Sequence, residues 1–240
     1  MPAGWEIFLV LAVVFFTTLI RSTLGFGNAL LAMPLLTLLI GIKGASPLVA
    51  LLGLVVSVLM LLQGWRAVNW RQIMILLLAS LPGILLGLAL LTAGPERIVK
   101  WILGLVLVVF GMYGVLEIRL PHIKAGWLSV PFGFLAGALG AAYNTNGPPI
   151  IIYGVFQGWE RDQFRASLQG FFLVSNVLIA AGHGLAGLWT SQVLRLFLAA
   201  ALPAAGAVFL GERIASKIPQ DQFDRLIYTF LVLMGLAMFL

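Results

Sequence analysis

Cysteine is absent from the 240-residue sequence. Its absence excludes thiol chemistry, disulfides and cysteine-ligated metals, and it says nothing decisive about the redox compartment. Charge is scarce as well: Asp, Glu, Lys and Arg make up 9% of the residues, against about 25% in a soluble globular protein. Since 62% of the residues are hydrophobic, the chain has too little polar surface to stay in water, and we expect the lipid bilayer to be its solvent.

Acidic residues are missing from the middle of every apolar segment. All eight carboxylates fall at segment ends or in loops. Intramembrane carboxylates mark many proton relays and cation sites, so this pattern counts against a carboxylate-based cation pathway. It also counts against a membrane enzyme with paired carboxylates or a His-rich metal centre. No nucleotide-binding, serine-hydrolase or zinc-protease motif is present. We therefore predict no enzymatic activity, no cofactor and no metal site.

Two further features carry little functional information by themselves. His183 lies between two glycines near a segment end, and it fits a packing or interfacial role better than that of a proton carrier. The small-residue pairs Gly83 with Gly87 and Gly133 with Gly137 have the spacing of closely packed membrane helices. Such pairs fit a homodimer as well as a monomer.

What the sequence does have is a series of long apolar runs, and residues 73–91 and 98–116 reach the roughly 20 residues of a membrane-crossing helix. The segments are 5–22, 28–42, 46–63, 71–93, 96–117, 126–141, 147–158, 165–184, 190–212 and 221–240. The first lacks the basic start and the cleavage site of a signal peptide, so we interpret it as mature structure. The sequence thus predicts an all-α polytopic membrane bundle. Basic residues stand singly at segment ends and form no patch for nucleic acid.

The ten segments divide into two related halves of five. The halves are residues 1–118 and 126–240, with a linker at 119–125. Three matches occur in the same order in both halves: Gly25 and Pro34 with Gly140 and Pro149, Ala79–Pro82 with Ala200–Pro203, and Phe110–Gly111 with Met234–Gly235. We interpret them as an internal repeat.

Each half begins with a broken pair of segments. Segments 28–42 and 147–158 are too short to span the bilayer comfortably, and each follows a polar break that contains glycine. Lipid cannot satisfy the backbone of such breaks, which occur where protein or a water-filled cavity surrounds them. We expect a broken or re-entrant helix pair in each half. Ordinary tight turns outside the membrane are the alternative.

The distribution of lysine and arginine predicts the orientation. With five segments per half the two repeats must be inverted, and ten of the 14 basic residues then face one side, which should be the cytoplasm. Both termini would lie on the non-cytoplasmic side. Merging each broken pair into one crossing gives parallel repeats instead, with a weaker split of eight against five and Arg21 left inside the membrane.

A binding cavity that contains no acidic side chains suits an anion. Helices that begin near Asn28 and Gly147 would present free backbone N–H groups and the positive end of the helix dipole. In an inverted repeat these two ends approach each other near the middle of the membrane. Asn28, Asn144, Thr145 and Asn146 add neutral donors there, and we expect Gly27 and Gly147 to contact the substrate as well. Helix capping by the Asn and Thr side chains is the alternative and is compatible with binding.

One helix face adds a polar stripe. Arg165, Gln169 and Asn176 share a face of the eighth segment and suggest a wall of the chamber, although Arg165 could equally be a topology determinant at the interface. Arg21 precedes the first break and has the same two interpretations. Ser57 and Gln63 are weaker candidates.

Three short stretches resemble the sulfite exporter TauE/SafE family, also called the TSUP permeases. They are Ser22–Gly27, the Gly137–Gly140 stretch that leads to Asn146–Pro149, and Phe164–Ser167. The resemblance covers essentially the whole chain. It implies a secondary transporter of sulfite, sulfoacetate or related organosulfonates, driven by an ion gradient and not by ATP. It also implies that the two breaks and Arg165 contact the substrate.

The sequence and this resemblance together predict a transporter of a small sulfur-containing oxyanion in a bacterial inner membrane, exporting by alternating access. Its partners would be the anion and the lipid bilayer, with no nucleic acid. A passive anion channel and an uptake permease for another small anion are the alternatives. A membrane scaffold or enzyme subunit without a pore is a further one.

Overall fold

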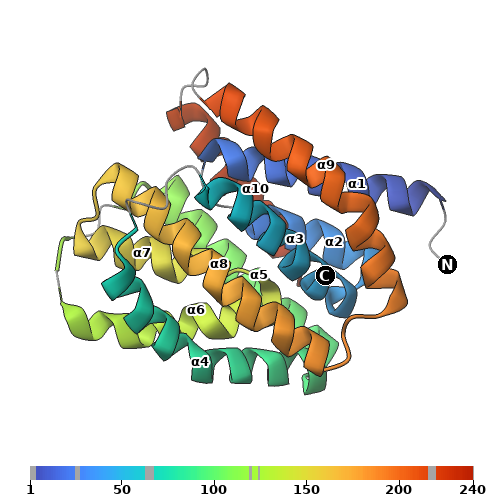
Figure 1. The fold of residues 1–240 in the computed structure, drawn as a ribbon, viewed down its shortest axis with the longest axis horizontal. Coiled ribbons are helices and arrows are strands. Elements are labelled where there is room, and N and C mark those ends of the chain that lie inside the picture. The colour runs from blue at the N-terminus through green and yellow to red at the C-terminus, as the bar shows by residue number, and fades with distance from the viewer. Residues whose placement is uncertain are drawn as a thin grey trace.

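The computed structural model describes residues 4–24, 28–62, 68–118, 121–123, 125–215 and 220–239. All regular structure in these ranges is helical (Figure 1). The elements are α1 (Gly4–Leu24), α2 (Asn28–Ile40), α3 (Ile42–Leu61), α4 (Trp70–Ala93), α5 (Glu96–Val115), the 3-10 helix η2 (Gly126–Leu128), α6 (Ser129–Tyr143), α7 (Gly147–Gln157), α8 (Arg161–Leu185), α9 (Ser191–Ala215) and α10 (Gln220–Ala237).

Seven of the described helices are long and apolar enough to cross a membrane. They are α1, α3, α4, α5, α8, α9 and α6 together with η2. The protein is thus a multi-pass, all-α membrane protein, as predicted. Helices α2 and α7 have 13 and 11 residues, or about 20 and 16 Å, which is short of a hydrocarbon core of about 30 Å.

The boundary between α2 and α3 differs from the prediction. The sequence suggested a loop between residues 42 and 46, but α3 already begins at Ile42. A single residue makes the break: Gly41 has a φ of 71°, which glycine adopts without steric cost. The carbonyl of Gly41 then accepts the amide of Ala45 at 2.9 Å and starts the new helix. The predicted loop at residues 43–45 belongs instead to the first turn of α3, because Gly41 alone makes the break.

Helices α6 and α7 form a hairpin whose two outer ends meet. The amide of Ile123, ahead of α6, donates to the carbonyl of Phe156 at 2.9 Å. The Gln157 side chain, at the end of α7, donates to the carbonyl of Ala125 at 3.1 Å. The chain therefore leaves this pair on the side where it entered. Merging α6 and α7 into one crossing is excluded, so the broken-pair interpretation holds for this half.

The most extensive contacts between opposite halves join α4 with α6, α1 with α9, α5 with α10, and α3 with α8 (Figure 1). Glycines permit the closest approaches, as their spacing predicted. A Cβ at Gly83 or Gly87 would collide with backbone carbonyls of α6, and one at Gly137 would collide with the Ser80 carbonyl of α4.

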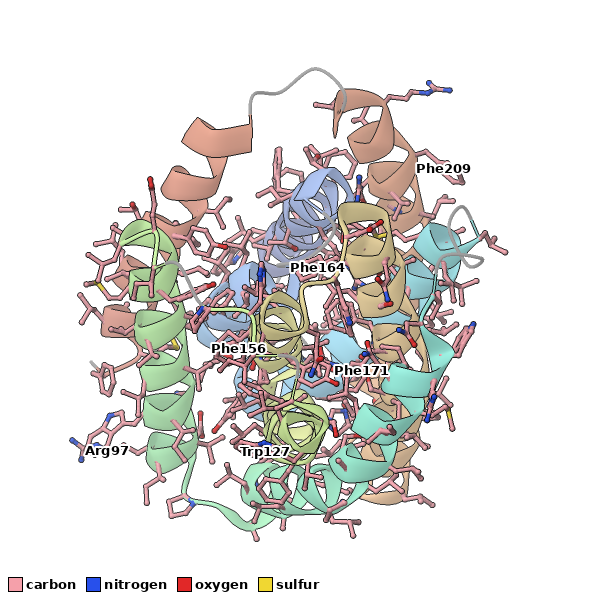
Figure 2. All side chains as sticks on the ribbon, turned by 90° about the vertical axis from the view of Figure 1, so that its left-hand side faces the viewer. Arg97, Trp127, Phe156, Phe164, Phe171 and Phe209 are labelled. Carbon is pink, nitrogen blue, oxygen red and sulfur yellow. The ribbon has the colours of Figure 1, made fainter. Side chains whose placement is uncertain are left out.

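The packing places one set of aromatic residues inside the bundle and another on its surface. Phe171 is fully buried and Phe156 is half-buried, whereas Figure 2 shows Phe209, like the charged Arg97, extending from an outer side of the bundle.

Candidate functional site

The break between α6 and α7 passes through the interior of the protein. Helix α6 ends because Asn144 adopts the left-handed conformation, with a φ of 54°, a region that asparagine tolerates better than most residues. Asn144, Thr145 and Asn146 are all buried. Buried irregular backbone inside a membrane protein occurs where it lines a cavity or is enclosed by protein.

The two asparagines of the break bind neighbouring helices. The Asn144 side-chain amide donates to the Ser46 carbonyl of α3 at 2.6 Å and to the Ser46 hydroxyl at 3.1 Å. The Asn146 amide donates to the Ser175 hydroxyl of α8 at 3.0 Å. Asn146 stands at the N-cap of α7 without a side-chain capping bond, so the capping alternative fails for this residue. Instead the two side chains fix the break against α3 and α8.

A small cavity lies beside this break. Its lining consists of Arg21, Ala29, Leu30, Val49, Gly53, Asn144, Thr145, Asn146, Gly147, Phe172 and Asn176. These residues come from α1, α2, α3, α7, α8 and the break. The cavity has a volume of about 30 Å³, room for about two water molecules, and in this conformation it suits an ion of a few heavy atoms.

Arg21, in the last turn of α1, is the central feature of the cavity. Its side chain is only 6% exposed, and it is the sole Lys, Arg, Asp or Glu among the buried residues that the structure describes. Its Nη2 atom donates to the Ser57 hydroxyl at 2.7 Å and to the Gln169 side-chain oxygen at 3.0 Å. The guanidinium carbon lies 5.5 Å from the centre of the Phe172 ring. All three side-chain partners are uncharged.

The guanidinium keeps unused binding capacity. An amino nitrogen of arginine carries two hydrogens, and Nη2 already uses both of them. The Nε hydrogen is buried without a partner. A buried charge is costly unless an opposite charge compensates it, and no ion pair to Arg21 occurs among the described residues. The cavity can therefore stabilise an anion.

Two helix N-termini add to the positive potential. Ala29 and Leu30 of α2 and Gly147 of α7 line the same cavity, so both helices direct the positive ends of their dipoles at it. Helix α7 has prolines at its next two positions, 148 and 149, which lack an N–H group. It therefore offers fewer backbone donors than α2.

The structure brings most of the predicted site residues together, but not all of them. Arg21, Asn144, Thr145, Asn146, Gly147 and Asn176 line the cavity, and Gln169 reaches it through Arg21. Gly27 lies outside the described residues, and Asn28 begins α2 with a side chain that the structure does not describe.

Arg165 lies elsewhere. Its side chain is exposed and does not line the cavity. It precedes the buried stretch of α8, which starts at Ala166 and runs to Phe172. Of the two interpretations of Arg165, its exposure fits the topology determinant at the interface.

Sequence reasoning missed several supporting residues. Ser46 and Ser175 hold the asparagines of the break, and Ser57, one of the weaker candidates, holds Arg21. Gly53 was also missed, although a Cβ there would lie 2.8 Å from the Asn176 side-chain nitrogen. The available signal was small residues on otherwise apolar helices, which is also the signal of ordinary helix packing.

Comparison with known proteins agrees with this architecture. A family model described as sulfite exporter TauE/SafE matches residues 10–238. No curated protein and no solved structure shows a significant match to the chain. The family match covers nearly the whole chain, it agrees with the resemblance seen in the motifs, and it is a match to membrane transporters and not to enzymes. The protein therefore belongs to the sulfite exporter TauE/SafE family.

Proposed function

We propose that the protein is a secondary transporter that exports a small sulfur-containing oxyanion, sulfite or an organosulfonate, from bacterial cells across the inner membrane. The observation that carries this proposal is Arg21, a buried cation whose described partners are all neutral and which lines a cavity with two helix N-termini. The small volume of the cavity favours sulfite over the larger organosulfonates.

The residues proposed to contact the anion are those that the cavity supplies. The Arg21 guanidinium provides charge, and the backbone at the start of α2 and at Asn146 and Gly147 provides donors. Asn144, Thr145, Gln169 and Asn176 shape and orient this lining. Gly27 and Asn28 remain candidates because they adjoin Ala29.

Alternating access about an inverted repeat is the proposed mechanism. The repeat relates α1 to α6, α2 to α7, α3 to α8, α4 to α9 and α5 to α10. Exchanging the two halves therefore turns the pair α4–α6 into the pair α9–α1 and turns the pairs α5–α10 and α3–α8 into themselves. All four of these pairs are in contact. Gly111 and Gly235, which match in the repeat, are 124 residues apart, and the same offset relates Gly104 to Tyr228. A Cβ at Gly104 would meet the Gly235 carbonyl at 2.7 Å, and the exchanged pair, Gly111 with the Tyr228 carbonyl, is equally close at 2.9 Å. Such exchange supports two-fold related halves. The distribution of lysine and arginine, and not this packing, is the basis for proposing both termini on the non-cytoplasmic side.

The first test is a thermal-stability screen of detergent-solubilised protein against sulfite, sulfate, thiosulfate, sulfoacetate, taurine and chloride. A ligand that binds only the folded state raises its apparent stability. We expect sulfite to raise the melting temperature of the wild type. No shift with any of these compounds would contradict the proposal.

Arg21→Gln tests the site itself. Loss of the guanidinium should weaken sulfite binding by about tenfold or more, because charge-assisted hydrogen bonds are the strong ones. Arg165→Gln is the matched control, since it removes the same charge from an exposed position, and it should leave affinity unchanged. Equal affinities of the two variants would remove Arg21 from the site.

Counterflow in proteoliposomes separates a carrier from the alternative of a passive channel. A carrier should show saturable exchange of radiolabelled sulfite against unlabelled sulfite. Flux that rises without saturation would indicate a channel.

A further inference from the structure

His183 is a buried titratable group that the anion site does not use. Its side chain is 0% exposed, although it stands only two residues from the end of α8. Leu88 of α4 approaches the neighbouring Gly182, and the Trp189 ring folds back against Gly184. The end of α8 is thereby enclosed. The imidazole is inside the protein and not at the interface, where the sequence suggested it could lie.

The hydrogen bond of His183 fixes its tautomer. Its Nε2 atom lies 2.8 Å from the carbonyl oxygen of Ala141. A carbonyl can only accept a hydrogen bond, so Nε2 carries the hydrogen and the Nδ1 atom of the neutral ring bears a free lone pair. Nδ1 is buried and has no partner. The side chain therefore presents an unpaired base inside the protein.

The acceptor of this bond is one of the last four carbonyls of α6, which have no partner within the helix. The neighbouring carbonyls of Gly140 and Leu139 accept the amides of Asn144 and Thr145. His183 thus caps the end of α6 from α8. Burial opposes a charged imidazole, and the partial negative charge at the C-terminus of α6 offsets part of that cost for a protonated histidine.

Nothing acidic competes for the proton. The helices that pack against α8 most extensively are α3, α4, α6 and α7, and none of them contains Asp or Glu. Their titratable groups are Lys43, whose Nζ is bound to the Thr92 carbonyl, Arg71, Tyr143 and Tyr153. Arg161, Asp162 and Arg165 of α8 itself lie at its opposite end.

His183 is linked to the anion cavity along the interface of α6 and α8. It follows Asn176 by seven residues, about 10 Å along the helix axis. Between them Ile179 packs on Gly140, where a Cβ would come within 2.9 Å of its side chain. Next to Asn176, the Ser175 hydroxyl accepts a hydrogen bond from the Asn146 amide at 3.0 Å. A change at the end of α6 therefore reaches the break that lines the cavity.

We propose that His183 is the proton-binding site that couples a proton gradient to anion transport. A hydronium ion transfers its proton to the Nδ1 lone pair, so that an O–H bond breaks, an N–H bond forms and water leaves, and the imidazolium holds the Ala141 carbonyl through a charge-assisted hydrogen bond. The added positive charge favours an anion in the cavity, and by linkage the bound anion favours the proton. The inference rests on the proposed transport function and deepens it: a proton and an anion that favour each other's binding are carried together, and with sulfite as the dianion the net charge moved is negative, so an inside-negative membrane potential drives export.

The decisive measurement uses the full-length wild type with isotope-labelled histidine in nanodiscs. The chain has two histidines, and His122→Gln assigns the signals. We expect the Nδ1 resonance of His183 to change to the protonated form between about pH 8 and pH 5, at higher pH when sulfite is present. A Nδ1 that stays unprotonated throughout this range overturns the proposal without any variant of His183.

The transport test compares His183→Gln with His122→Gln in proteoliposomes. Glutamine can donate to the Ala141 carbonyl but cannot take a proton. Since sulfite itself titrates near neutral pH, all proteins are compared at identical pH. The His183 variant should retain counterflow of radiolabelled sulfite and lose accumulation driven by a pH gradient, while the His122 variant behaves as wild type, because His122 is exposed in the central loop.

Either of two results with the His183 variant would overturn the inference. Undiminished gradient-driven accumulation would show that the proton binds elsewhere, and loss of counterflow as well would assign His183 a structural role. Failure of the proposed function is a separate result, since it appears as absent sulfite binding in the wild type.

Discussion

At the scale of the residue, Arg21 and Arg165 show what a sequence can and cannot say about a charge. Both lie in or next to motifs typical of the family. From the sequence, each could be either a residue of the binding site or a topology determinant at the membrane interface. Arg21 is buried and Arg165 is exposed. The difference arises from tertiary packing, because Ser57 and Gln169 come from helices distant in the sequence. Periodicity does identify the face of α8, since Gln169 and Asn176 are both buried.

Gly53 provides a prediction at this scale. Gly53→Ala should be tolerated by the helix itself, because alanine is a better helix former than glycine. Its Cβ would come within 2.8 Å of the Asn176 side-chain nitrogen and displace that side chain from the cavity. We expect sulfite affinity to fall by about tenfold with little change in melting temperature.

Ligand titration by thermal shift measures both quantities. Gly206→Ala is the control, since no atom outside its own helix lies within 4 Å of the added Cβ. Equal affinity of the two variants would show that the position of Asn176 does not matter.

At the scale of the element, the helices and their approximate bounds follow from hydropathy, and the two short helices were identified in advance. The break at Gly41 was placed too late in the sequence because one residue suffices to make it. The partners of the Asn144 and Asn146 side chains were also beyond prediction. A polar residue on an apolar helix shows that it needs a partner and does not say which helix supplies it.

The contact between α4 and α6 gives the prediction for this scale. In Gly137→Ala the new methyl group would collide with the Ser80 carbonyl, and a backbone carbonyl cannot move aside without separating the helices. Overpacking of this kind costs about 1–3 kcal/mol. Reversible unfolding in mixed micelles should show that loss relative to Gly206→Ala. Full stability of the Gly137 variant would mean that the helices separate at no cost.

At the scale of the whole molecule, two halves and an orientation were predicted from short matches and basic residues. The contacts between loops agree with the predicted sides, because Ile123 meets Phe156 and Gln72 meets Trp159, and each pair belongs to one predicted side. The compartments that these sides face stay a prediction. Packing within a bundle is independent of which side is the cytoplasm.

The absence of cysteine makes the orientation directly measurable. Ile123→Cys and Ala186→Cys place single thiols in two exposed connections that the inverted model assigns to opposite sides. In right-side-out vesicles a membrane-impermeant maleimide should label the Ala186 variant and spare the Ile123 variant until the vesicles are opened. The opposite pattern would invert the topology, and labelling of both would contradict it.

The two neutral acceptors on Nη2 of Arg21 have a consequence for the return half of a transport cycle. An unloaded carrier has to reorient with nothing in its chamber, and a bare cation would make that step prohibitive. Here a hydroxyl and a carboxamide accept hydrogen bonds from the guanidinium, and these contacts offset part of the cost of its burial when no anion is bound. An oxyanion that binds the guanidinium through two oxygen atoms has to displace the hydroxyl or the carboxamide from Nη2. For the proposed carrier, this partial solvation would favour net movement of the anion over strict one-for-one exchange.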